Sequence, residues 1–180
     1  MFRKKAEPAP IVPHAVIALT SDYLIEGYTS LEECEPFLTS FEDDEEKEDS
    51  LLVITSAQIQ PLGARSFAPA SAASWRVPYS AGFIAAIPRD EAALAYVREQ
   101  NEDMTHAFGA QIFAGPYAMR GTVLSCYEKG DESDLIFSFG SLLLQDVEID
   151  YLAADGMTKG IKVNYAVVNM QAVQGILLND

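Results

Sequence analysis

Short stretches in which apolar and polar residues alternate recur along the chain and predict β-strands. The first, AVIALTSDYLIEG at residues 15–27, is broken by Thr20, Ser21 and Asp22, which suit a tight turn. The second, LLVITSAQIQPL at 51–62, starts as an apolar run and then alternates. The first part of the chain is therefore expected to run strand, turn, strand, loop, strand.

The same two patterns return later in the chain and in the same order. AQIFAGPYAMRG matches the first stretch and ends on Gly121, which lies 94 residues after Gly27. SLLLQDVEIDYL matches the second stretch and starts 90 residues after it. A recurrence of this kind predicts that one structural unit occurs twice.

A third pair of segments extends the repeat. VNYAVVNMQAV at 163–173 matches VPYSAGFIAAI at 77–87. The separation is 86 residues, and it aligns Tyr165 with Tyr79. Spacing that drifts while the order is kept is expected when a unit was duplicated and only its loops changed in length. Each half is large enough to form a small closed β-barrel, in which closure would remove exposed sheet edges.

The segment between the repeats predicts an amphipathic helix. Within residues 89–108, Asp90 is placed to cap the first turn, and Ala93, Leu94 and Val97 recur near helical spacing. This helix would connect the two repeats and shield one end of a barrel.

The order of the segments resembles the Sm-like fold, a strongly bent five-stranded barrel. The first motif of that family has alternating apolar residues, a turn, a glycine, a variable loop and a further strand. The residues that fit it are Ile17, Leu19, Gly27 and LLVITSAQI in the first half, and Phe113, Gly121 and LLLQDVEI, with Asp146 as the acid, in the second. VNMQAV at 168–173 aligns with the second motif, and the chain is also similar to small bacterial proteins of unknown function that carry one such barrel.

The repeat and the resemblance together predict a mainly β fold of two tandem small five-stranded Sm-like or SH3-like β-barrels joined by an α-helix. The expected organisation is a disordered N-terminal tail at 1–13, a first β-barrel repeat at 14–88, a linker helix at 89–108 and a second β-barrel repeat at 109–180.

The residues that RNA-binding members of the family use are replaced in this chain. Those members grip a base and its phosphate with an Asn after the second strand and with the Arg-Gly pair of the second motif. Here the acidic run EDDEEKED at 42–49 lies near the first place, while Phe83-Ile84 and Asn169-Met170 occupy the Arg-Gly positions. The resemblance thus supports the fold and argues against the usual activity.

Three residues remain as candidates for binding a ligand. Asn169 stands in the second motif, and Tyr165 and Tyr79 are the matched aromatics that could stack on a base. Because basic neighbours are missing, packing of the tyrosines in a core or an interface is the competing interpretation.

The charge balance narrows the class of partner. The 180 residues include 12 basic and 27 acidic side chains, a net charge of −15, and no basic stripe beyond Arg3, Lys4 and Lys5. Nucleic-acid binding draws much of its affinity from basic side chains, so nucleic acids and anionic membranes are poor partners for this chain. No apolar run approaches the roughly 20 residues that cross a bilayer and no signal peptide is recognisable, so a cytoplasmic protein is expected.

Groups that could perform catalysis or hold a metal are sparse. His14 and His106 have no partner nearby in sequence, and Cys34 and Cys126 lie too far apart for a metal or disulfide framework and are expected to be reduced thiols. The acidic run at 42–49 lacks the spaced acids and central glycine of a calcium loop, so a solvated charged loop is expected. No catalytic residue, metal site or cofactor is predicted.

These observations predict a non-enzymatic protein in which the tandem of small barrels acts as an assembly or protein-interaction module. Barrels that close incompletely leave edge strands open for pairing, so a protein partner or self-association is expected. The alternative is an Sm-like RNA-binding protein with degenerate binding residues. An enzyme whose groups meet only on folding is a third possibility.

Overall fold

The computed structural model of the chain describes residues 12–38, 51–63, 69–79, 82–125, 140–153 and 155–178. Residues 1–11 of the expected tail, the acidic run at 42–49 and Cys126 lie outside these ranges. Within them, none of the helices has the length and apolar character needed to span a membrane.

The first half of the chain folds into strands with one short helix. Its elements are β1 (His14–Thr20), β2 (Tyr23–Thr29), α1 (Leu31–Leu38), β3 (Leu51–Pro61), β4 (Ala70–Pro78) and β5 (Phe83–Pro88). The expected turn between the first two strands is present, and Thr20 Oγ1 accepts a hydrogen bond from the amide of Tyr23 at 3.0 Å. The helix α1 was not predicted, because eight residues that include a proline give little periodic signal.

The second half repeats the strands. Its elements are β6 (His106–Ala114), β7 (Tyr117–Ser125), β8 (Ser141–Leu152), β9 (Thr158–Asn169), the 3-10 turn η1 (Met170–Ala172) and β10 (Val173–Leu178). Between the halves lies α2 (Glu91–Gln100), at the place of the predicted linker helix. The helix is shorter than residues 89–108, because Asn101 caps its C-terminus and β6 already begins at His106.

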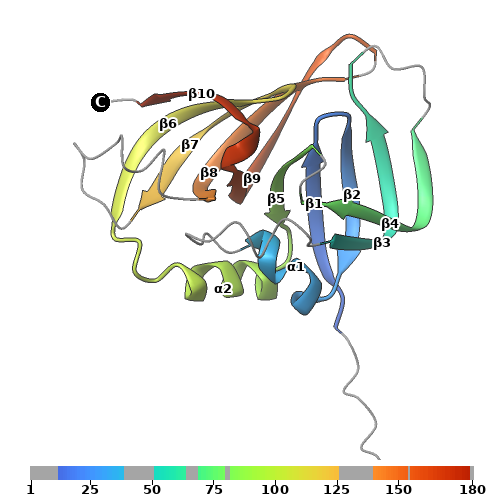
Figure 1. Cartoon of the computed structure of the whole chain (residues 1–180), viewed down its shortest axis with the longest axis horizontal. Helices are drawn as coiled ribbons and strands as arrows, with labels where there is room; N and C mark the ends of the chain where they lie inside the picture. The colour runs from blue at the N-terminus through green and yellow to red at the C-terminus, as the bar shows by residue number, and fades with distance from the viewer. Residues whose placement is uncertain are drawn as a thin grey trace, which may run out of the picture.

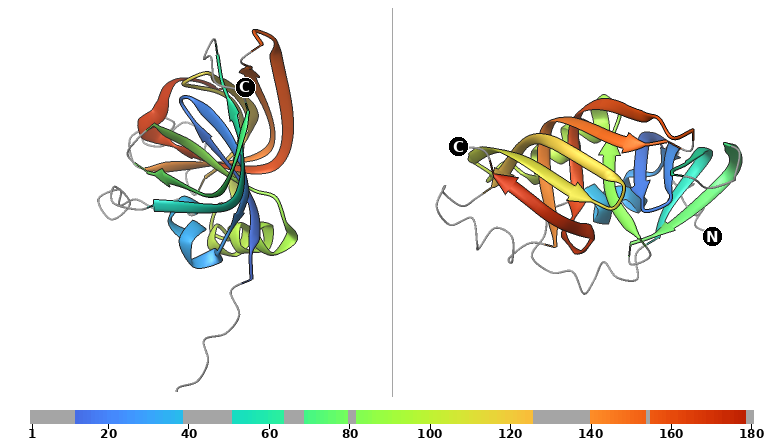
Figure 2. Two further views of the ribbon diagram at one scale, coloured as in Figure 1. Left: turned by 90° about the vertical axis from the view of Figure 1, so that its right-hand side faces the viewer. Right: turned by 90° about the horizontal axis from the view of Figure 1, so that it is seen from above.

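All the strands belong to one antiparallel sheet of ten strands in the order β10-β6-β7-β8-β9-β5-β1-β2-β3-β4. The prediction of a mainly β fold is confirmed. Each half contributes five neighbouring strands, and within each half the order is the fifth strand, then the first, second, third and fourth. Figure 1 shows the two halves side by side with α1 and α2 beneath them, and Figure 2 shows that the sheet is strongly curled.

Both halves bend at the same place. On the third strand of each half, one residue with positive φ, Ser56 (51°) or Asp146 (53°), lies where the pairing slips by one residue. A glycine, Gly27 or Gly121, faces each slip on the neighbouring strand. A Cβ atom added there would lie 2.7 Å (Gly27) or 2.8 Å (Gly121) from a carbonyl oxygen of the facing strand. Only glycine therefore allows the strands to approach so closely.

The pairing registers of the two halves correspond strand by strand. The first and second strands correspond at a separation of 94 residues, the third at 90, the fourth at 91 and the fifth at 90. The predicted separation of 86 for the third pair of segments is wrong. It matched Tyr79, at the end of β4, to Tyr165 inside β9, whereas the register makes Ser74 the counterpart of Tyr165.

The sheet carries a separate hydrophobic core on each of its two faces. Ala85 belongs to the cluster that fills the second half, and its neighbour Ala86 belongs to the cluster that fills the first half. Every residue of β5 is consequently buried. A strand that is covered on both faces needs no apolar-polar alternation, and FIAAIP shows none.

Candidate functional site

The strands β5 and β9 join the two halves of the sheet, and we call this junction the seam. Ala85 pairs with Val168 and Ala86 pairs with Val167. Ala85 and Val168 point into the core of the second half, while Ala86 and Val167 point into the core of the first half. The seam is therefore buried on both faces.

Each half closes the core of the other half at the seam. The residues of the first half that join the core of the second include Ile17, Leu19 and Ile87. The residues of the second half that join the core of the first include Leu143, Tyr165 and Val167. This reciprocal packing makes the two halves depend on each other.

Two of the predicted ligand-binding residues form hydrogen bonds at the seam. Asn169 is buried, its Nδ2 donates to the carbonyl of Phe83 at 3.1 Å, and its Oδ1 accepts from the amide of Gln171 at 3.0 Å. Tyr79 is buried too, and its hydroxyl donates to the carbonyl of Gly140 at 3.4 Å. These two bonds cross between the halves and help to hold the second half on the first.

The third predicted residue, Tyr165, lies under the linker helix. Its ring is buried, and the guanidinium carbon of Arg98 on α2 lies 5.9 Å from the ring centroid. The contact with Tyr165 is the main cause that raises the pKa of Arg98. Tyr79, Tyr165 and Asn169 thus all lie close to the seam, and a role for them in ligand binding stays a prediction.

The two ends of the sheet are the counterparts of the two strands that form the seam. At one end lies β10, the counterpart of β5, and at the other lies β4, the counterpart of β9. In the part of the chain that the structure describes, β10 pairs only with β6 and β4 pairs only with β3. Each half therefore presents to solvent the edge that the other half uses inside the chain.

The edge at β10 exposes apolar side chains. Leu177 is 56% exposed, Leu178 is 37% exposed, and Phe113 on the adjacent β6 is 36% exposed. The strand VQGILL contains no charged residue and no proline, which are the usual means of keeping an edge strand from pairing. In the first half, the counterparts of Phe113 and Leu177 are Leu19 and Ile87, which are fully buried in the seam.

The edge at β4 has a different character. Its sequence ASAASWRVP is rich in small residues and exposes much of its length. On the side that faces the core of the first half, Trp75 and Ala72 are only partly buried. The ring of Trp75 meets that of Tyr23 edge to face, with the ring centroids 6.0 Å apart. The core of the first half is thus incompletely covered beyond β4.

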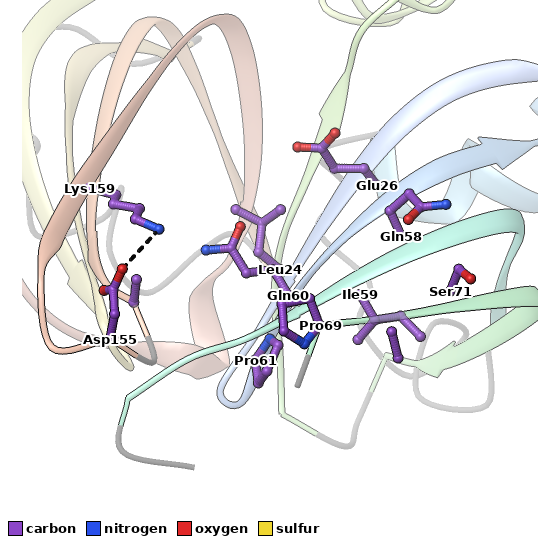
Figure 3. Close-up of a pocket in the computed structure, with 12 residues that line it drawn as sticks. Leu24, Glu26, Gln58, Ile59, Gln60, Pro61, Pro69, Ser71, Asp155 and Lys159 are labelled. Atoms are coloured by element: carbon purple, nitrogen blue, oxygen red, sulfur yellow. Dashed lines mark ion pairs between the residues drawn. The ribbon is translucent and has the colours of Figure 1, made fainter. Parts of the chain in front are cut away.

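A groove of about 620 Å³ lies between the first half and the turn that joins β8 to β9. Figure 3 shows Asp155 and Lys159 on one side of it, joined by an ion pair of 3.4 Å, and Glu26, Gln58 and Ser71 on the other. The described residues that line it include no histidine and no cysteine. Its polar groups do not form a nucleophile with a base, so the groove gives no indication of catalysis.

One histidine has a carboxylate partner that the sequence did not reveal. His14 Nδ1 lies 3.2 Å from Asp90 Oδ1, and Asp90 also accepts from the amides of Ala15 and Ala93. Burial acts to raise the pKa of Asp90, but these hydrogen bonds outweigh it and the pKa is lowered. The Asp90 carboxylate thus anchors α2 to β1. Among the described residues, no three His, Cys, Asp or Glu side chains are grouped so that they could hold a metal ion.

The sequence did not single out the exposed residues at β10. Phe113 enters only through the Sm-like resemblance, and the strand patterns do not mark Leu177 or Leu178 as exposed. The sequence does show an apolar strand that lacks the charged residues which usually protect an edge. Whether that strand is exposed depends on its place in the order of the sheet. That order could not be obtained from local periodicity.

The chain was compared with protein-family models, with curated proteins and with solved structures, and none of the three comparisons gave a match.

Proposed function

We propose that the protein is a non-enzymatic assembly or protein-interaction module, made of two small Sm-like or SH3-like β-barrels fused through the seam. Its working surfaces are the sheet edges at β4 and β10. The single observation that carries the proposal is that the strands equivalent to these edges pair with each other inside the chain. The exposed apolar side chains on β10 and β6 support it, because apolar patches at an unprotected edge favour protein contact.

Strand addition fits this surface better than a small-molecule site does. An added strand gains main-chain hydrogen bonds along the edge, and alternate side chains supply specificity. The groove beside β2 is wide and carries mixed charges, and two of its charged groups already form an ion pair with each other. Few polar groups are therefore left to point together at a small ligand.

The test combines two binding measurements on the full chain. We expect light scattering or affinity capture to detect a protein partner, which is either another protein or a second copy. We expect Leu177→Lys to weaken that association, because it places a charge on the apolar edge. We expect no binding to single-stranded RNA at low salt, where electrostatic attraction is least screened. The proposal would be refuted if the chain is monomeric and captures no protein. It would also be refuted if Leu177→Lys leaves the association unchanged.

A further inference from the structure

We infer that the partner of these edges is a second copy of the same chain, added head to tail so that β10 of one copy pairs with β4 of the next. This inference rests on the proposed function and specifies its partner. The pairing would repeat, between copies, the seam that β5 and β9 form within each copy.

The seam fixes the register of this pairing. Ala85 lies opposite Val168, and the counterparts of these two residues are Gly175 and Val77. Continuing the antiparallel register from that pair places Leu177 opposite Trp75 of the second copy. The most exposed apolar side chain of β10 thus meets the partly buried indole of β4.

The chemistry of one face of the new junction matches the seam. In the seam, Leu19 and Ile87 cover the core of the second half beyond β9. Between copies, Phe113 and Leu177 hold the equivalent places and would cover the core of the first half beyond β4. Trp75 is the residue they would cover. Both surfaces lose water, which favours association.

The other face of the junction differs from the seam and limits its strength. In the seam this face carries the buried residues Leu143, Tyr165 and Val167. Their counterparts on β3 and β4 are Val53, Ser74 and Arg76, of which Ser74 and Arg76 are exposed. A junction that is apolar on one face only should form reversibly. Because the junction joins unlike edges, copies can add one after another, and they form a ring if the rotation between copies closes and an open filament if it does not.

The first experiment measures the mass of the full chain by light scattering from about 1 to about 500 μM, a range that covers typical weak association. We expect the mass to rise with concentration. Leu177→Lys is expected to weaken the association at least tenfold. The matched control is Met157→Lys, which makes the same change at an exposed side chain on the β8–β9 turn and should leave the association unchanged.

The second experiment tests the register. Copies carrying only Ser74→Cys are mixed with copies carrying only Leu178→Cys, since the inferred register places these two positions opposite each other. We expect oxidation to yield a disulfide-linked pair of unlike copies. Ser71→Cys in place of Ser74→Cys shifts the thiol by three residues and should reduce the yield severalfold. The unsubstituted chain reports any reaction of the native cysteines.

The outcomes separate this inference from the proposed function. The inference is overturned if the chain stays monomeric over the whole concentration range. It is also overturned if Leu177→Lys leaves the measured mass unchanged. If such a monomer still captures another protein through an edge that Leu177→Lys disables, self-pairing is refuted and the proposed function stands. If neither association depends on Leu177, both are refuted. Cross-links with equal yield at Ser71 and Ser74 contradict the head-to-tail register.

Discussion

The two halves of this chain share a backbone path but differ in the residues placed on it. Both have the same strand order, and both combine a positive φ residue on the third strand with a facing glycine on the second. The fifth strands nevertheless differ completely, since FIAAIP is buried throughout and VQGILL is partly exposed. The comparison teaches that features required for bending the sheet are the same in both halves. Side chains differ according to what covers each strand.

The side chains on the outward faces of the second to fourth strands also differ between the two halves. In the second half, Arg120 pairs with Asp150 and Lys162 pairs with Glu148 on the surface. The counterparts of these residues in the first half are Glu26, Gln60, Ser71 and Gln58, and all four line the groove. The exposed charges are thus not part of what makes the halves alike.

The largest expected effect comes from the shared glycines. Gly27→Ala and Gly121→Ala each push a Cβ against a backbone oxygen at less than 3 Å, so each should lower the free energy of unfolding by about 1–3 kcal/mol. Denaturant unfolding would measure both. Gly175→Ala is the control, because its Cβ would meet nothing closer than a side-chain atom of Phe113 at 4.0 Å. If one of the two shared glycines tolerated alanine freely, the halves would not share their bend.

The next largest effect concerns a residue that the second half has and the first half lacks. Asn169→Ala removes the buried bond to the carbonyl of Phe83 across the seam and should cost about 1–2 kcal/mol. The counterpart of Asn169 in the first half is Pro78, which cannot form this bond. Asn164→Ala, at an exposed position of the same strand, serves as the control and should change unfolding by less than about 0.5 kcal/mol. Equal effects at the two positions would mean that Asn169 does not hold the seam.

The anchor of α2 should have a smaller effect, and one that depends on pH. Asp90→Ala removes the helix cap and should cost about 1 kcal/mol at neutral pH. Because folding lowers the pKa of Asp90 below its ordinary value of 3.8, its stabilisation is complete above that value and is lost as the pH falls through the lower folded value. Unfolding curves at several pH values should therefore converge for the two proteins only in acid. A difference that persists unchanged in strong acid would assign the cost to packing alone.

The smallest effect is expected on the charged surface. The Glu148 side chain is half exposed, and Lys162 lowers its pKa mainly through their hydrogen bond. Glu148→Gln gives this position the residue of its counterpart, Gln58, and should leave the unfolding midpoint within error at physiological salt. A clear drop in the midpoint would show that the ion pairs of the second half stabilise its sheet and that the halves differ in more than their surfaces.

Local features of the fold could be predicted from the sequence because local physics determines them. The strand, turn and strand around Thr20, the equivalence of Gly27 and Gly121, and the helix that begins after Asp90 were all obtained from short-range patterns. The sequence patterns do not predict the short helix α1, because it spans barely two turns. The correspondence of β4 with β9 was wrong because the similar residues around Tyr79 and Tyr165 favour a separation of 86, whereas the strand pairing gives 91.

The candidate site could not be predicted in the same way, because it is defined by the order of strands. Whether Leu177 and Ile87 are exposed or buried depends on which strand lies beside them, and nothing in their immediate sequence decides it. Asn169 and the two tyrosines were singled out from motifs and matched positions, and the structure places all three close to the seam. The assignment of the chain to the Sm-like family stays a prediction.

Hydrogen exchange at two protein concentrations would test most directly whether the outer edges serve for assembly. Amides of β5 and β9 should be protected at both concentrations, because the seam pairs them inside every copy. We expect the amides of β4 and β10 that point away from β3 and β6 to exchange quickly in dilute protein and to gain protection together when the protein is concentrated. Exchange at both edges that is independent of concentration, with no added partner able to slow it, would contradict the proposed role.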